Sequence, residues 1–301
     1  MKNIYKFLFF SLLTMLAFVA CDPQDGDDHS LGAPDTVTAD QVSFSYTKDP
    51  KSDNVLNLKI ADGINVPYSV LWDLGNEETS KDKAVTAEYP FAGTYKISLT
   101  VYTADGTAIV KEQEVTFDKD DYTLLQTPKY TSLTGGLDFE GGKTWVFDRT
   151  VEGHFGIGPA DGDKPGWWSC PPEGKAECSL YNQQFNFSLS KTGGLKLIWT
   201  NEGKVYTNEP GRAALAKEGY TKSSVPPAGD FDVEYTPKDS YTFKMSEKAG
   251  ILTLNGGAFF GHYTGNSTYS IVNLTDDELY LKVVSAVEPG NGWWYRFVPK
   301  K

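Results

Sequence analysis

Tryptophan is the residue type whose placement in this sequence most directly suggests a chemistry. An indole ring at a partly wet surface can stack on the apolar C–H face of a sugar while neighbouring amides, carboxylates and arginines bond the hydroxyls. The same ring can equally serve in a hydrophobic core, so each position needs its own argument. Six of the seven tryptophans lie beyond residue 122, at Trp145, Trp167, Trp168, Trp199, Trp293 and Trp294.

The adjacent pair Trp167 and Trp168 is the best candidate for a sugar-binding platform. The preceding residues 156–166 are rich in Gly, Pro and Asp and show no strand period, so a loop is expected to carry both rings. Neighbouring side chains on extended backbone point in opposite directions, which predicts one ring in the core and one exposed. Cys170 and Cys178 flank a turn-rich Pro-Pro-Glu-Gly segment, and a predicted disulfide between them would hold this loop rigid.

Residues 293–297, Trp-Trp-Tyr-Arg-Phe, read as an aromatic strand. Alternation places Trp293 with the tyrosine and the phenylalanine on one face, which we expect in the core. Trp294 and Arg296 then share the other face, where a ring beside a hydrogen-bond donor would suit a sugar. We predict that this pair is part of the binding site.

The remaining aromatic candidates divide between a cleft and the core. His262 and Tyr263 follow two phenylalanines and a glycine, and we predict them at the edge of a cleft. Trp145 and Trp199 alternate with other apolar residues along strand-like segments, so both are predicted to be buried.

One acidic string suggests an alternative, enzymatic function. Asp230-Phe231-Asp232-Val233-Glu234 would put three carboxylates on one face of a strand. This spacing resembles the E-x-D-x-E strand of laminarinase-type glycoside hydrolases, in which one carboxylate attacks and another protonates the leaving group. Here the shorter Asp230 stands at the position of the nucleophile. Three acids are also what a solvated strand face carries, and we expect no catalytic residue.

Other catalytic and metal motifs find little support in the sequence. His154 and His262 have no Ser or Cys partner at a telling spacing, and no H-E-x-x-H string or Cys/His cluster occurs. Asp161-Gly162-Asp163 offers oxygen ligands for a structural calcium, although a plain turn explains it equally. No metal or other cofactor is therefore expected to be required.

The first residues of the chain read as an export signal. Lys2 and Lys6 precede an apolar run at 7–19 that is too short to span a bilayer comfortably. The run ends in Ala20-Cys21, which resembles the lipobox of lipoprotein signal peptidase. That resemblance implies a signal peptide at 1–20 and lipid on Cys21. An ordinary secretory signal is the alternative.

Residues 21–40 form a polar, acidic segment that cannot bury enough apolar surface to fold, so we expect a disordered tether. Acidic residues directly after the cysteine resemble the surface-export signal of Bacteroidota lipoproteins. The resemblance implies an outer-membrane anchor and exposure at the cell surface. A lipoprotein that faces the periplasm is the alternative. The net charge of −12, from 28 basic and 40 acidic residues, argues against nucleic acid as a partner.

Residues 41–118 show the two-residue period of half-buried strands, with turns at Asp62-Gly63 and Asp105-Gly106. The string at 69–76, Ser-Val-Leu-Trp-Asp-Leu-Gly-Asn, and the later Tyr, Phe-Ala-Gly-Thr-Tyr at 89–95 resemble a PKD domain. Leu74 and Asn76 depart from that family's W-D-F-G-D-G turn. The resemblance implies an Ig-like β-sandwich that serves as a spacer or a protein-contact module. Trp72 is then a core residue.

Residues 122–301 contain about ten short strand-like segments and one helix-like piece at 211–219, which favours a larger jelly-roll β-sandwich. The expected fold class is therefore all-β, with two successive sandwiches. The Gly-Gly-Lys-Thr-Trp segment at 141–145, the 153–168 stretch and the closing 293–299 strand resemble the module that follows PKD domains in Bacteroidota polysaccharide-utilisation lipoproteins. That likeness implies capture of a polysaccharide or oligosaccharide beside a porin-type importer and its partner lipoprotein. A docking lipoprotein without a sugar site remains a further alternative.

Overall fold

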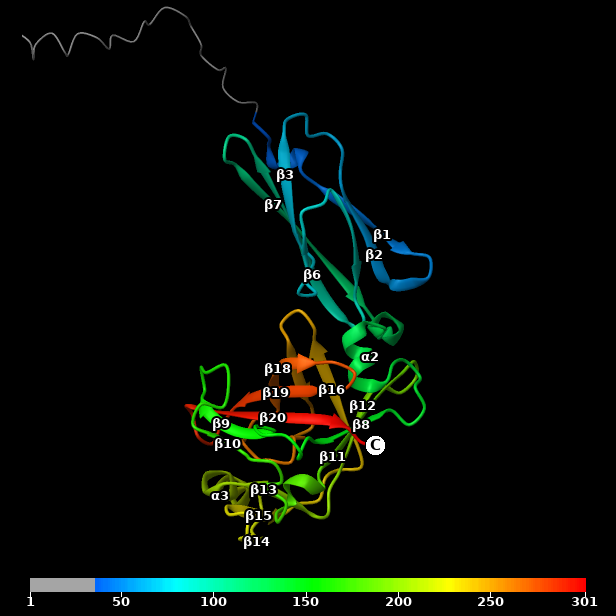
Figure 1. Cartoon of the computed structure of the whole chain (residues 1–301). Coiled ribbons are helices and arrows are strands. Elements are labelled where there is room, and N and C mark those ends of the chain that lie inside the picture. Colours follow the sequence, from blue (N-terminus) through cyan, green and yellow to red (C-terminus); the bar gives the residue numbers. More distant parts are fainter. Residues whose placement is uncertain (1–35) are drawn as a thin grey trace, which may run out of the picture.

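The computed structural model describes residues 36–301, which form two all-β domains arranged end to end (Figure 1). The predicted signal peptide at 1–20, the lipid-attachment residue Cys21 and the tether as far as residue 35 lie outside the described residues. Within 36–301, no helix combines the length and apolarity that a membrane span requires. The all-β class with two successive domains is confirmed.

The first domain is a seven-stranded β-sandwich. One sheet has the order β1-β2-β5 and the other the order β4-β3-β6-β7, with all pairs antiparallel. A short 3₁₀ helix, η2 (Ala39–Gln41), precedes them. The strands are β1 (Phe44–Asp49), β2 (Ser52–Ile60), β3 (Tyr68–Asp73), β4 (Thr79–Ser80), β5 (Ala84–Glu88), β6 (Gly93–Thr103) and β7 (Ala108–Phe117).

Trp72 lies at the centre of this sandwich, as predicted. Its ring is fully buried and meets Phe44 edge to face at 5.1 Å between ring centroids. The indole Nε1 donates to the Asp82 carbonyl oxygen at 2.8 Å, so the buried polar atom is satisfied. A ring placed in this way stabilises the domain and offers no face to a ligand.

The second domain contains thirteen strands, two α-helices and two 3₁₀ helices among the described residues. The helices are η3 (Tyr122–Leu125), α2 (Pro128–Thr134), η4 (Ser179–Asn182) and α3 (Glu209–Lys217). The strands of the main sheet are β8 (Lys143–Phe147), β9 (Phe155–Pro159), β10 (Trp168–Ser169), β11 (Gln184–Ser190), β12 (Gly194–Thr200), β16 (Tyr241–Ser246), β17 (Ile251–Leu254), β18 (Thr268–Leu274), β19 (Leu279–Val284) and β20 (Asn291–Pro299). The small sheet has β13 (Lys204–Thr207), β14 (Ser223–Ser224) and β15 (Phe231–Glu234).

The main sheet closes on itself, which refines the jelly-roll expectation. Its order is β10-β9-β20-β19-β18-β17-β16-β12-β11-β8, and β20 also pairs with β8. Most neighbours in the ring are also consecutive in the sequence, whereas a jelly roll keeps two sheets linked by Greek-key crossings. One edge of the long strand β20 is shared: residues 291–295 pair with β9 and residues 297–299 pair with β8. The result is a closed antiparallel barrel with β9 and β10 attached as a flap.

Aromatic side chains fill the interior of the barrel. Phe185, Phe187, Phe260, Tyr295 and Phe297 are all fully buried and stand edge to face or tilted against one another. An eight-stranded ring has room for side chains but none for a solvent channel. Trp145 and Trp199 are buried as predicted, at 0% and 2% exposure. The barrel interior is therefore packed with side chains, so a candidate ligand site has to be sought on the surface.

Candidate functional site

Trp167 and Trp168 are the two exposed tryptophans among the described residues. Their side chains are 58% and 40% exposed, whereas the other five are buried. The expectation that one of the pair would be core is wrong, because β10 is a short edge strand with solvent beyond it. Trp168 meets the buried ring of Phe155 edge to face at 6.1 Å, which fixes its orientation. Two adjacent rings are thus presented to water at one end of the flap.

The flap holds these rings by close backbone packing. The Trp167 amide donates to the Ile157 carbonyl oxygen at 3.0 Å, continuing the β9–β10 pairing. A Cβ atom at Gly158 would lie 2.6 Å from the Gly166 amide nitrogen, so only glycine lets the 160–167 loop lie directly on β9. The Lys282 ammonium donates to the Gly162 carbonyl oxygen at 2.5 Å and ties the loop tip to β19. The platform is therefore braced.

Trp294 is not part of the binding surface, contrary to the prediction. It lies outside the aromatic core that holds Trp293 and Tyr295, as the alternation requires, but the Lys282 ammonium lies 5.1 Å from its ring centroid and its exposure is 0%. A Cβ atom at Gly158 would lie 3.2 Å from its ring, which shows how closely β9 covers the indole. The predicted partner Arg296 bonds Glu278 at 3.2 Å and lies over the Tyr280 ring. This ring-and-donor pair is therefore structural.

His262 and Tyr263 do not border a cleft together. His262 is 1% exposed and is enclosed by aromatic rings, with the Trp293 centroid 4.3 Å away. Burial lowers the pKa of His262 to about 3, so the ring is neutral at physiological pH. Tyr263 is half-buried, and its hydroxyl donates to Glu218 at 2.5 Å. The predicted cleft edge is therefore wrong for His262, which belongs to the core.

The two cysteines that were predicted to form a disulfide are free and buried. Cys178 Sγ donates to the Lys175 carbonyl oxygen at 3.3 Å. Burial raises the pKa of both thiols, that of Cys178 to about 12, so both are protonated at neutral pH. The segment between them is held by other contacts, which centre on the side chain of Lys175.

Lys175 is a buried ammonium directly behind the exposed platform. Its Nζ lies 5.5 Å from the centroid of the Trp168 ring and 4.7 Å from that of the Tyr206 ring. The ammonium donates to the Ala228 carbonyl oxygen at 2.9 Å and to the Tyr206 hydroxyl. Burying a lysine is costly unless such partners compensate, so this residue fixes three segments in one arrangement.

Asp230 completes the arrangement at the surface. The Tyr206 hydroxyl donates to Asp230 Oδ2 at 2.8 Å, so contacts run without a break from the Trp168 ring through Lys175 and Tyr206 to this exposed carboxylate. Burial, with a smaller contribution from Asp230, raises the pKa of Tyr206 and keeps its hydroxyl a donor. The backbone of Asp230 is in the left-handed region at φ 54°, a conformation that costs energy for a non-glycine residue.

The acidic string does not form the shared carboxylate face that the hydrolase alternative needs. Asp230 precedes β15 and lies outside the strand. Asp232 is buried and accepts from the amide and hydroxyl of Ser179 at 3.0 and 2.7 Å. Glu234 is exposed and pairs with Lys222 at 3.5 Å. The three carboxylates therefore have three separate environments, and one of them stabilises the fold.

Asp161 and Asp163 are exposed on the flap loop. Among the described residues, no three His, Cys, Asp or Glu side chains gather in a way that could hold a metal ion. A structural calcium at this loop stays a prediction. The chemistry that the surface itself offers is a pair of exposed rings and a fixed hydrogen-bond acceptor, Asp230, that is linked to Trp168 through Lys175 and Tyr206.

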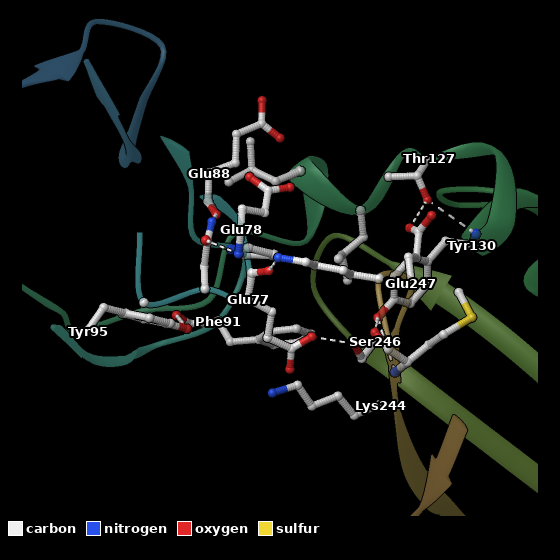
Figure 2. Close-up of a pocket in the computed structure, with 17 residues that line it drawn as sticks. Glu77, Glu78, Glu88, Phe91, Tyr95, Thr127, Tyr130, Lys244, Ser246 and Glu247 are labelled. Atoms are coloured by element: carbon white, nitrogen blue, oxygen red, sulfur yellow. Dashed lines mark hydrogen bonds between the residues drawn. The ribbon is translucent and has the colours of Figure 1, made fainter. Parts of the chain in front are cut away.

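A hollow with a volume of about 330 Å³ lies between the two domains (Figure 2). It is lined by Gly75–Glu78 of the sandwich and by Lys244–Lys248 of the barrel. The Lys244 ammonium lies over the Phe91 ring at 5.1 Å, and Phe91 and Tyr95 are both partly buried. Trp167 and Trp168 are exposed, so the flap is the better candidate for sugar binding.

Comparison with known proteins gives only partial likenesses. No protein-family model matches the sequence, and a search of curated proteins finds no match. The solved structures that are similar include the PKD1 domain of the Vibrio cholerae metalloprotease PrtV, at 26% identity over 26% of this chain and 95% of that chain. The PKD1 domain of Vibrio anguillarum Epp is 22% identical over 26% of this chain and 92% of that one.

A third similar structure comes from work on the promiscuous specificity of carbohydrate-binding modules of the β-sandwich superfamily. It is 12% identical and covers 86% of this chain and 91% of that one. All three similarities have a TM-score of 0.23. The fold assignment therefore stands on the strand pairing described above.

Sequence analysis missed the residues that support the platform. Lys175 stood in a stretch interpreted only as a disulfide-bridged turn, and Tyr206 in a four-residue strand that was not predicted. Asp230 was considered as a catalytic group or as part of a solvated strand face. A buried lysine has no pattern that marks it in a single sequence, since its environment comes from segments far apart in the chain.

Proposed function

We propose that this protein binds glycans through a platform made of Trp167 and Trp168, with Asp230 as a hydrogen-bond acceptor at its side. The supporting observation is that these two rings are exposed on a braced flap while every other described tryptophan is buried. A rigid ring loses little conformational entropy when a ligand stacks on it, and a fixed carboxylate can accept bonds from hydroxyls. Both features suit the C–H face and the rim of a pyranose.

The finer part of the proposal concerns the biological setting. An export signal followed by Cys21 and an acidic segment supports a lipoprotein of the outer membrane, exposed on the cell surface. The resemblance to Bacteroidota modules supports capture of polysaccharide for a polysaccharide-utilisation system. A porin-type importer and its partner lipoprotein would then receive the glycan, and the PKD-type sandwich would act as the spacer.

Affinity electrophoresis against β-glucans, mannans, xylans and host glycans tests the proposal. The wild-type protein should be retarded by at least one of them. Trp168→Ala should weaken the binding constant about five- to thirtyfold, the equivalent of roughly 1–2 kcal/mol for a lost stacking contact. Thermal melting should be nearly unchanged, because the ring is 40% exposed.

Phe139→Ala is the matched control for this experiment. Phe139 is another exposed aromatic residue of the second domain, at 55% exposure, and lies in the loop before β8. The Phe139→Ala variant should be retarded by the glycan as strongly as the wild-type protein. If no glycan retards the wild-type protein, or if Trp168→Ala binds as tightly as the wild type, the platform is not a sugar site. A docking function would then be favoured.

A further inference from the structure

Exposed acids outnumber exposed basic residues in the segments that carry the platform, although Glu173 and Glu234 are paired with Arg149 and Lys222. Within residues 160–178 and 228–234 there are two lysines, and Lys175 is buried and engaged with Tyr206 and Ala228. Lys164 is exposed and lies next to an aspartate. The exposed acids in the same segments are Asp161, Asp163, Glu173, Glu177, Asp230 and Glu234.

The nearby Arg149 does not change this balance. Its guanidinium bonds Glu173 at 2.5 Å and lies over the Tyr181 ring at 4.7 Å. An arginine that is already paired with a carboxylate offers little attraction to a second anion. Within the described residues Lys175 has no carboxylate partner, but it is buried and its ammonium is engaged by Tyr206 and Ala228. Lys164 is therefore the exposed cation that these segments offer to a ligand.

Asp230 has one oxygen committed and one available. Oδ2 accepts from the Tyr206 hydroxyl, and among the described residues no hydrogen bond reaches Oδ1. Tyr206 is itself held by the Lys175 ammonium, so the carboxylate is oriented before any ligand arrives. A fixed, exposed carboxylate oxygen can accept a charge-assisted hydrogen bond from a hydroxyl. The same oxygen repels a second carboxylate or a sulfate.

We infer that the platform selects uncharged glycans, and that Asp230 is the residue that enforces this selection. Trp168 takes the apolar face of a neutral pyranose, and Asp230 accepts from its hydroxyls. Uronates and sulfated sugars are rejected because they would bring an anion against Asp230 and the surrounding acids. This inference rests on the proposed glycan binding and names its substrate class.

The test uses a matched pair of ligands. The neutral polysaccharide that the wild-type protein binds best is compared with its own C6-oxidised derivative, which keeps the linkages but carries carboxylates. At low ionic strength the oxidised form should bind at least about tenfold more weakly, and added salt should narrow the difference because it screens the repulsion. Equal or tighter binding of the oxidised form would overturn the inference and leave glycan binding itself intact.

Asp230→Asn examines the assigned residue. Binding of the neutral glycan should weaken about tenfold, because a hydrogen bond to a charged acceptor is lost. The preference for the neutral over the oxidised form should also shrink. Glu177→Gln is the matched control: it removes the same charge from an exposed position in the same surface and should preserve both binding and preference.

The outcomes separate the two proposals. If Glu177→Gln reduces the preference as much as Asp230→Asn does, the selection comes from the general charge of the surface and the role of Asp230 is refuted. If the wild-type protein binds no glycan at all, or if Trp168→Ala is without effect, the proposed function fails before selectivity arises. Melting curves of Asp230→Asn confirm that any loss of binding is measured on folded protein.

Discussion

At the scale of single residues, what covers a side chain decides its role here more than which face of a strand it occupies. Trp293 and Trp294 point to opposite faces, as the alternation of a strand requires. Trp293 contacts Phe155 and His262 on the inner side. Trp294 points outward and is nevertheless fully buried, because β9 and the Lys282 side chain pack against it. Periodicity predicted the directions correctly, but it holds no information on what a distant loop covers.

The same limit applies to the polar residues of the site. Asp232 looked like its neighbours in the acidic string, but it is buried against Ser179. Lys175 looked like a surface lysine, but it is buried behind Trp168. Both outcomes depend on contacts between segments more than 30 residues apart, which no local pattern encodes. The composition of the surrounding loop predicted one exposed ring, whereas the exposure of the second ring was not predicted.

His262 predicts an acid sensitivity of the second domain. Its pKa is about 3 in the folded state and about 6.5 in an unfolded chain. The contribution of the neutral His262 ring to stability is therefore fully present above pH 6.5. As the pH falls toward 3, the unfolded chain takes up a proton that the folded chain rejects, and stability is lost at up to about 1.4 kcal/mol per pH unit. Urea unfolding should therefore give a free energy of unfolding that is lower near pH 5 than at neutral pH, and this residue should account for about 2 kcal/mol of the difference.

His262→Gln isolates that contribution. The variant is expected to be less stable overall, so the quantity compared is the change between the two pH values. The decrease in its free energy of unfolding on acidification should be about 2 kcal/mol smaller than that of the wild type. An equal loss in both proteins would assign the acid sensitivity elsewhere. Burial also lowers the pKa of His154, which gives the variant a residual slope of the same sign.

At the scale of elements, segments with a clear period were predicted well and segments built around glycine were not. The sequence pattern predicts strands at 184–189, 195–200, 241–245, 251–254, 269–274, 278–284 and 293–298. The barrel strands β11, β12 and β16–β20 match these segments within one or two residues. β9 was interpreted as loop, because Gly156 and Gly158 interrupt its apolar pattern. Glycine is required at both positions because residues 164–168 pack directly on β9. α2 was missed because it has seven residues, too few for a helical period to be seen.

The junction between the domains is a set of turn-to-turn contacts (Figure 2). The Ser246 hydroxyl donates to the Glu77 carboxylate, and the Lys248 ammonium donates to the Glu77 carbonyl oxygen. The Thr127 hydroxyl, just before α2, donates to Glu247. Glu77 adopts a left-handed backbone conformation at φ 74° that is uncommon for this residue type. These contacts fix how the sandwich is oriented on the barrel.

Removing the contacts of Glu77 should loosen this orientation. Glu77→Ala combined with Lys248→Ala deletes the ionic side chains of both turns. Small-angle scattering should then show a broader distribution of overall dimensions. Each domain should melt within about 0.5 kcal/mol of the wild type, since exposed ion pairs and hydrogen bonds contribute little to folding.

Glu78→Ala is the control for the junction experiment. Glu78 lines the same hollow, but its side chain makes no hydrogen bond or ion pair to the barrel within the described residues. Scattering from this variant should match that of the wild type. If the Glu77 and Lys248 double variant also matches, other contacts hold the domains and the two turns are incidental.

At the scale of the whole molecule, the sandwich separates the start of the described chain from the barrel. Residue 36 lies at the end of the sandwich remote from the barrel (Figure 1). A chain anchored before residue 36 would hold the flap one domain length away from its attachment point. The order of segments along the sequence suits a protein that reaches outward from a membrane.

Lipid attachment at Cys21 is the prediction that belongs to this scale. In a bacterial host that processes lipoproteins, the wild-type protein should incorporate labelled fatty acid and sediment with membranes. Cys21→Ala should do neither, because each acyl CH₂ contributes about 0.8 kcal/mol to membrane partitioning and the variant has none. Cys178→Ala should keep the label. Label on Cys21→Ala, or membrane association without it, would refute the assignment.

The closure of the barrel by β20 affects the order in which the strands pair during folding. β8 and β20 are far apart along the sequence, so joining them has a high loop-closure entropy and should come late in folding. The flap is attached to the same strand, because β9 pairs with β20. A chain released early or cut before β20 would thus have neither a sealed ring nor a working platform.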